Sequence, residues 1–259
     1  MMQELQIGGT GALLQTRSVS KSFGALRAAR DITFTLEAGA RHALIGPNGA
    51  GKTTFINLLT GVLQPSEGQI LLKGQDITTT EQAARVKLGI ARTFQINRLF
   101  RGLSVLENVY IAVSERVGAA PTMIAPAGHR RDVIDESMHL LETLNLQDDA
   151  HLRISELPYG RQRLVEIAIA LGLKPEVLLL DEPAAGVPSA ESHIILNAID
   201  ELPKHIGVLI IDHDMDLVFR FAERITVMVQ GAVFAEGTPN EIGANADVRA
   251  VYLGQASHG

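Results

Sequence analysis

Residues 46–53 read Gly-Pro-Asn-Gly-Ala-Gly-Lys-Thr, a glycine-rich loop that ends in a lysine and a hydroxyl side chain. The loop follows the expected strand 41–45 and precedes a segment with helical spacing, so it connects a strand to a helix. Its glycines let backbone N–H groups point at phosphate oxygens, and the helix N-terminus adds a favourable dipole. We therefore expect a phosphate-binding loop in an α/β fold, formed by Gly46, Pro47, Asn48, Gly49, Ala50, Gly51, Lys52, Thr53 and Thr54.

The last residues of this loop have distinct expected roles. The Lys52 ammonium reaches the β- and γ-phosphates of a nucleoside triphosphate, and the Thr53 hydroxyl is a ligand for Mg²⁺. A Gly-rich turn that precedes Lys-Thr by coincidence is a poor alternative, because the whole pattern and its strand-to-helix setting are both present.

Four apolar residues, 177–180, precede the acidic pair Asp181 and Glu182. A buried central strand would present Asp181 at its C-terminal edge, where ligands sit in open α/β sheets. We expect Asp181 to hold Mg²⁺ and Glu182 to polarise the attacking water as a general base. Alone, such a run is often a strand that enters a solvated turn; the phosphate loop upstream favours the functional interpretation.

The composition of the 259 residues excludes several classes of protein. Without cysteine the chain has no disulfide scaffold, no thiolate metal site and no cysteine nucleophile. Apolar runs stay far below the ~18 uncharged residues that a membrane span needs, and the N-terminus lacks the pattern of a signal peptide. The net charge of −6 argues against nucleic acid as a main partner. We therefore expect a cytoplasmic chain.

Short β-rich segments open the chain, and strand and helix patterns alternate over residues 177–229, which implies a parallel sheet flanked by helices. A helical insertion is expected at about 96–160, with a loop rich in Ala, Pro and Gly at 118–128. The expected strands are 13–19, 32–36, 41–45, 69–72, 177–180, 207–211 and 225–229. The expected helices are 51–60, 105–113, 132–144, a stretch after Pro158 that ends at Leu173, 189–202 and 215–222.

The chain resembles the ATP-binding cassette (ABC) family over nearly its full length, because three further residues occur in the order found in that family. Gln95, in Arg-Thr-Phe-Gln, resembles the glutamine that contacts Mg²⁺ and the attacking water. His213 resembles the histidine that bonds the γ-phosphate, and Phe23 the aromatic residue that stacks on adenine. The ligands implied are ATP and Mg²⁺. The implied catalytic residues are Glu182, His213, Lys52 and Gln95, and the implied metal ligands are Thr53, Gln95 and Asp181.

The signature segment departs from the family's L-S-G-G-Q pattern. It reads Leu157, Pro158, Tyr159, Gly160, Arg161, so two of its residues match. The resemblance implies that this segment contacts the ATP of a partner subunit. Pro158 offers neither a hydroxyl nor a backbone donor, whereas the Gly160 N–H and the following helix N-terminus can still face a phosphate. We expect a working but altered contact.

The segment 184–189 departs as well, since Ala-Ala-Gly-Val-Pro-Ser lacks the aspartate of the family's S-x-L-D pattern. With Arg-Thr-Phe-Gln at 92–95 and Val-Tyr-Leu-Gly at 251–254, these departures resemble the ATPases of branched-chain amino acid importers. That branch includes importers of urea, amides and aromatic acids, so the solute stays open. Pro188 stands where the branch usually has asparagine.

The resemblance implies an α/β P-loop NTPase cassette with a mixed sheet core, an N-terminal antiparallel β subdomain and an inserted helical subdomain. Residues 1–95 would form the N-terminal part of the nucleotide-binding core. Residues 96–164 would form the helical subdomain that ends in the signature segment, and residues 165–259 the C-terminal part of the core.

The implied function is ATP hydrolysis that drives import of branched-chain or other amino acids. Each composite site would need two cassettes, so we expect a dimer with an identical or a paralogous ATPase subunit. The further partners would be a membrane permease and, indirectly, a solute-binding protein, with no nucleic acid. Such a chain would be peripheral at the inner face of the membrane.

Three other functional interpretations remain. A soluble ABC protein that acts on ribosomes or DNA would usually carry two cassettes or a coiled-coil insertion, together with basic surfaces. An exporter ATPase is disfavoured by the branch motifs. A P-loop kinase would lack the signature helix and the histidine at position 213.

Overall fold

The structure is a computed structural model that describes residues 11–93, 99–118 and 130–253. Its N-terminal part contains a four-stranded antiparallel sheet with the order β2-β1-β4-β5. These strands are β1 (Ala12–Phe23), β2 (Leu26–Glu37), β4 (Glu67–Leu72) and β5 (Gln75–Asp76). The side chains of Ile32, Phe34 and Leu36 alternate with exposed neighbours along β2, as expected for a sheet with one solvated face.

A six-stranded sheet with the order β10-β9-β3-β8-β7-β6 forms the centre of the molecule. Its strands are β3 (Arg41–Ile45), β6 (Ile90–Arg92), β7 (Val177–Asp181), β8 (Gly207–Ile211), β9 (Arg224–Val229) and β10 (Ala232–Gly237). All run parallel except β10, which pairs antiparallel with β9. The expected mixed sheet core and antiparallel β subdomain are confirmed.

The central strands are buried on both faces, because successive side chains of a strand point to opposite sides. In β7, Leu178 and Leu180 enter a core that the sheet shares with the helical insertion. Leu179 enters a second core, which the sheet shares with the antiparallel sheet. The apolar runs 177–180 and 208–211 therefore account for part of the mean hydropathy of +0.15.

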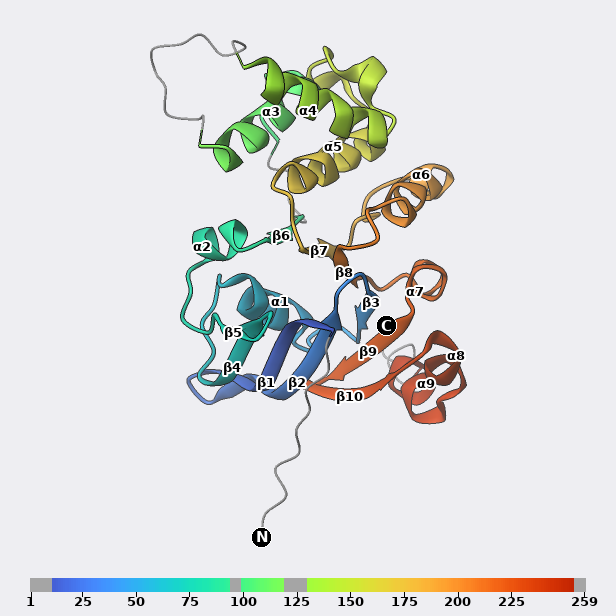
Figure 1. Ribbon diagram of the computed structural model, residues 1–259. Helices are drawn as coiled ribbons and strands as arrows, with labels where there is room; N and C mark the ends of the chain where they lie inside the picture. Colours follow the sequence, from blue (N-terminus) through green and yellow to red (C-terminus); the bar gives the residue numbers. More distant parts are fainter. Residues whose placement is uncertain (1–10, 94–98, 119–129, 254–259) are drawn as a thin grey trace.

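Helices flank the sheets (Figure 1): α1 (Lys52–Thr60), α2 (Gln82–Lys87), α6 (Ser189–Asp200), α7 (Met215–Phe221), α8 (Pro239–Ala244) and α9 (Ala246–Leu253). Helix α1 follows the glycine-rich loop, as expected from its pattern. Its last turn is tied down by Arg85, a fully buried side chain from α2. The guanidinium donates to the carbonyls of Leu58 and Leu59 at 2.7 and 2.9 Å, and to those of Thr78 and Thr80. Burial lowers the pKa of Arg85 to about 10.

Three helices form a bundle on one side of the central sheet (Figure 1): α3 (Val105–Arg116), α4 (Arg131–Thr143) and α5 (Tyr159–Gly172). Ser104 starts α3 with a capping box, in which its hydroxyl accepts from the Glu107 amide and the Glu107 carboxylate accepts from the Ser104 amide. The helical insertion between β6 and β7 is thus confirmed. Most of the predicted loop at 118–128 lies outside the described residues.

The expected three-part division of the chain stays a prediction. Helix α5 crosses its boundary at residue 164, so this helix joins the bundle to the segment that leads into β7. Within the described ranges, no helix is long and apolar enough to cross a membrane.

Candidate active site at the carboxyl edge of the parallel sheet

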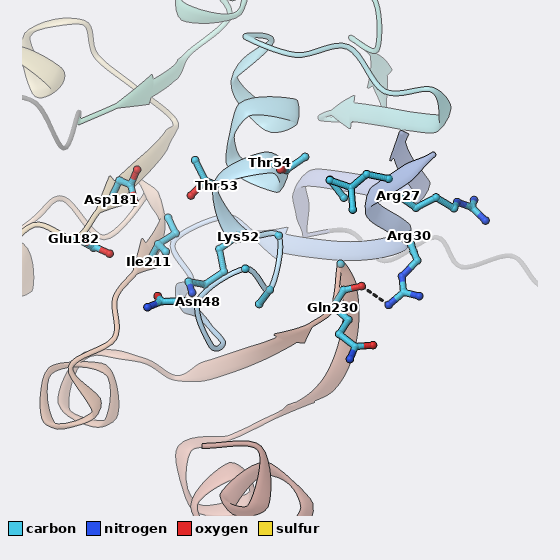
Figure 2. Close-up of a pocket in the computed structure, with 16 residues that line it drawn as sticks. Arg27, Arg30, Asn48, Lys52, Thr53, Thr54, Asp181, Glu182, Ile211 and Gln230 are labelled. Atoms are coloured by element: carbon cyan, nitrogen blue, oxygen red, sulfur yellow. Dashed lines mark hydrogen bonds between the residues drawn. The ribbon is translucent and has the colours of Figure 1, made fainter. Parts of the chain in front are cut away.

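A cavity of about 690 Å³ lies beside the glycine-rich loop, where β7 ends. Figure 2 shows Lys52, Thr53, Asp181 and Glu182 around it, so the structure brings together the two motifs that the sequence predicted. The other predicted residues that line it are Asn48, Gly49, Ala50, Gly51 and Thr54. The sequence did not predict the residues that β2 and the β9–β10 turn contribute, which are Leu26, Arg27, Ala28, Arg30, Gln230 and Gly231.

Glycine is required at two positions of the loop by the close approach of neighbouring backbone. A Cβ at Gly51, where φ is +95°, would lie 2.6 Å from the carbonyl oxygen of Ala28. A Cβ at Gly46 would lie 2.3 Å from the carbonyl oxygen of Met228. Gly51 is also the N-cap of α1, so the free N–H groups of the first helical turn open onto the cavity and favour an anion.

The Lys52 ammonium is held at the mouth of this loop. It lies 2.5 Å from the carbonyl oxygen of Gly46 and 3.1 Å from that of Pro47. Burial lowers the pKa of Lys52, whereas the negative charges of Glu182 and Asp181 raise it. The cavity thus places the half-buried Lys52 cation next to the amides of the first helical turn on one side and carboxylates on the other.

Asp181 is held by a residue that the sequence did not predict. The Arg92 guanidinium lies 2.6 Å from Oδ2 of Asp181, and both side chains are nearly buried, with 11% and 7% exposed. The same guanidinium donates to Oδ1 of Asn57 in α1 at 2.7 Å. Arg92 therefore connects β6, β7 and the phosphate-loop helix.

Glu182 and His213 meet although they follow different strands. Oε1 of Glu182 lies 3.7 Å from Nδ1 of His213, whose side chain is 74% exposed. The Glu182 backbone has φ +47° and its amide donates to the Ile211 carbonyl at 2.8 Å, so it is fixed to the end of β8. Asp212 shapes the histidine turn, because its carboxylate accepts from the His213 and Asp214 amides. Burial raises the pKa of Asp212, and these bonds lower it.

Two oxygen donors suit a magnesium ion. The Thr53 hydroxyl and the Asp181 carboxylate both line the cavity, and Mg²⁺ is usually bound by one or two such ligands together with phosphate and water. Across the described residues, no group of three or more His, Cys, Asp or Glu side chains could hold a metal on its own. The donor set therefore fits an ion that arrives with phosphates.

Other predicted site residues stand apart from the cavity. Phe23 has 47% of its surface exposed, with the Lys21 ammonium 5.4 Å from its ring centre, and in the described structure it does not line the cavity. Gln95 lies outside the described residues. The segment Leu157–Arg161 spans the start of α5 in the bundle and, within the described chain, contributes nothing to the cavity lining. The Arg161 guanidinium instead pairs with Asp149 of its own bundle.

Comparison with known proteins gives two family matches. Residues 29–185 match the family described as ABC transporter, and residues 232–258 match the one described as branched-chain amino acid ATP-binding cassette transporter. The chain is 39% identical to the high-affinity branched-chain amino acid transport ATP-binding protein LivG of Escherichia coli, over 94% of this chain and 98% of that protein. It is 38% identical to the corresponding protein BraF of Pseudomonas aeruginosa, with the same coverage of both chains.

Solved structures resemble the fold over the same span. The crystal structure of an ATP-binding cassette of an ABC transporter in its ADP conformation has a TM-score of 0.83 and 32% identity, covering 95% of this chain and all of that one. A nucleotide-free ATP-binding cassette has a TM-score of 0.82 and 30% identity, with coverage of 93% and 98%.

Proposed function

This chain belongs to the ABC transporter family of ATP-binding cassettes, and we propose on that premise that it hydrolyses ATP to drive a membrane importer of branched-chain amino acids. One observation carries the catalytic part: a single cavity gathers the phosphate loop, Asp181 and Glu182. The transport part is supported by the C-terminal family match at 232–258 and by relatives named for branched-chain amino acid transport.

Hydrolysis begins with a water that attacks the γ-phosphorus, and the bond to the bridging oxygen breaks to release ADP. Glu182 accepts the proton of that water, and its position at the cavity edge supports this role. His213, beside Glu182, donates a hydrogen bond to the γ-phosphate. Lys52 binds the β- and γ-phosphates. Most of the acceleration comes from positioning and from stabilisation of charge.

Thr53 and Asp181 would hold Mg²⁺ through their side-chain oxygens, and Gln95 stays a further predicted ligand. The ion neutralises phosphate charge when it is bound. Arg92 fixes the orientation of the Asp181 carboxylate through their ion pair. Phe23 would reach adenine from the exposed end of β1.

A second cassette would complete the site. In the described chain the signature segment Leu157–Arg161 lies at the start of α5 rather than at the cavity, which supports a contact with the nucleotide of another subunit. The first-turn N–H groups of α5 can face an anion there, although Pro158 contributes none. The second subunit would be identical or paralogous.

The permease would dock where the bundle meets the central sheet, which makes the chain peripheral at the inner face of the membrane. A cavity of about 180 Å³ lies between β6 and α5, and it is lined by Arg92, Thr93, Leu99, Glu166, Ile169, Ala170 and Leu173. Phe100, the residue after Leu99, has 58% of its surface exposed. This apolar surface supports a contact that links a permease to Arg92 and so to Asp181. A solute-binding protein would act on the cassette only through the permease.

Reconstitution with a candidate permease and solute-binding protein in liposomes tests the proposal. Leucine, isoleucine or valine on the binding-protein side should raise the rate of ATP hydrolysis, whereas urea, acetamide and phenylacetate should not. If only one of those three compounds stimulates hydrolysis, the chain still serves an importer, but the transported solute is that compound and not a branched-chain amino acid. If the chain hydrolyses ATP without a permease and copurifies with ribosomes or DNA, the proposed role in transport is wrong.

A further inference from the structure

Two segments that depart from the family pattern meet in the structure. Tyr159, where the signature pattern has glycine, is the first residue of α5, and Gly186 lies in the loop after Glu182. A Cβ added to Gly186 would lie 3.1 Å from Cε1 of Tyr159 and 3.5 Å from its Cζ and Oη. A side chain at residue 186 would therefore crowd the aromatic ring, which would have to shift by a few tenths of an ångström. The φ of +77° at Gly186 adds a second reason for glycine.

The ring is also held from the side of its own helix. The guanidinium carbon of Arg163 lies 5.1 Å from the centre of the Tyr159 ring, a distance at which a cation is attracted to the aromatic face. Arg163 is itself fixed, because it is buried and pairs with Glu166 at 2.7 Å. Burial raises the pKa of Glu166, and its bond to Arg163 lowers it. Tyr159 thus stands between a rigid part of α5 and the loop.

A hydrogen-bonded turn leads from Gly186 back to Glu182. The Ala185 amide donates to the Glu182 carbonyl at 3.0 Å, and the Val187 amide donates to the Ala184 carbonyl at 3.1 Å. Because these bonds close one compact turn, a displacement at Gly186 reaches the backbone of Glu182.

We propose that Tyr159 is a positioning residue that joins the start of α5 and the loop 182–188 into one unit. Whatever contacts the start of α5 then sets the position of Glu182. This inference rests on the proposed function, in which a second cassette's nucleotide meets the start of α5. Under it, the altered signature and the altered loop are two halves of one contact.

A double-mutant cycle tests whether the contact exists. Gly186→Ala creates backbone strain in either background, but its methyl group crowds the ring only when Tyr159 is present. We expect Gly186→Ala to lower the Tm by about 3 °C more in the wild-type background than in the Tyr159→Ala background, a shift typical of ~1 kcal/mol in a chain of this size. Equal shifts in the two backgrounds would show that the ring and residue 186 do not touch.

Hydrogen exchange tests whether the contact holds the loop. Tyr159→Ala should speed exchange of the Ala185 and Val187 amides, and Tyr159→Phe, which keeps the ring, should restore the wild-type rate. Phe234→Ala is the matched control, since Phe234 is an aromatic residue of similar exposure on β10. Unchanged exchange in Tyr159→Ala would overturn the proposal, whatever its effect on stability.

Turnover in the assembled transporter tests the consequence for Glu182. Tyr159→Ala should lower kcat about tenfold and change KM for ATP less than about twofold, because a misplaced catalytic group affects the chemical step rather than ATP binding. Phe234→Ala should retain wild-type kcat. A wild-type chain that never hydrolyses ATP would contradict the proposed function. If the wild type hydrolyses ATP and Tyr159→Ala hydrolyses it at the same rate, this inference is wrong and the proposed function stands.

Discussion

Arg92 and Asp181 form an ion pair of 2.6 Å in a nearly buried position, between the strand that enters the helical insertion and the strand that returns from it. Such a pair costs desolvation on both sides, but loss of one member leaves the other charge buried and uncompensated. Arg92 also donates to Asn57 in α1, so its removal affects the phosphate-loop helix as well.

Arg92→Ala should therefore lower the free energy of unfolding by roughly 3–5 kcal/mol, as measured by urea denaturation. Arg224→Ala is the matched control, because Arg224 pairs with Glu236 at the same 2.6 Å but with 57% of its side chain exposed. That exposed pair should contribute less than about 1 kcal/mol. Similar losses in the two variants would show that burial of the Arg92 pair is not what matters.

Lys52→Ala should abolish measurable ATP binding in isothermal titration calorimetry. The reason is that the cation at Gly46 and Pro47 is the group that the loop directs at the phosphates. Lys73→Ala, which removes an exposed lysine paired with Glu176, should bind ATP as the wild type does. Tight ATP binding by Lys52→Ala would argue against the phosphate-loop assignment.

Glu182→Gln should bind ATP and hydrolyse it at least ~100-fold more slowly, the usual size of a general-base effect. The amide keeps the size of the side chain beside His213 but cannot accept the proton of the attacking water. A phosphate-release assay measures the loss, with Glu176→Gln as a control at the opposite end of β7. Near-normal turnover would remove Glu182 from the catalytic residues.

His42 makes stability depend on pH. Its Nε2 lies 2.8 Å from the Thr226 hydroxyl, and burial lowers the pKa of His42 to about 4, an effect that Glu236 opposes and Arg224 strengthens. The unfolded chain binds a proton on this imidazole below pH ~6.5, whereas the folded chain does not until about pH 4. Stability should therefore fall as the pH falls from 6.5 to 4, by up to about 3 kcal/mol from this group.

Urea denaturation between pH 7.5 and about pH 4.5 measures how steeply the free energy of unfolding falls with pH, since His42 affects it only below the pKa of about 6.5 in the unfolded chain. His42→Gln should flatten it, and His205→Gln, which replaces an exposed histidine, should leave it unchanged. If His42→Gln lost stability with acid as steeply as the wild type does, buried carboxylates rather than His42 would dominate the response.

Elements with a clear hydrophobic pattern or a motif beside them could be predicted. The segment 41–45 matches β3, and the four apolar residues before Asp181 lie within β7. Elements with a weak or interrupted pattern could not be predicted: β6 has only three residues, and β10 has a register shift that interrupts its alternation. Tertiary contacts rather than local pattern hold such segments. The other strands and α-helices that the sequence did not predict are β5, α2, α8 and α9.

The site could be predicted as far as its motifs reach along the chain. Lys52 and Asp181 line one cavity, as the phosphate loop and the strand end together indicated. The partners of these residues could not be predicted, since Arg92 and Asp181 are 89 residues apart and neither residue type indicates the other. The same holds for Tyr159 and Gly186: the sequence shows that each lies in a segment that departs from the family pattern, and the fold shows that the two positions are neighbours.

Arg85, buried at the end of α1, affects a ligand that it never contacts. A helix carries about half a positive charge at its N-terminus and about half a negative charge at its C-terminus. The guanidinium offsets the partial negative charge at the Leu58 and Leu59 carbonyls. The partial positive charge at the phosphate loop is then opposed less by the other end of the helix. The electric field that draws an anion into the loop thus originates in part from the far end of the helix.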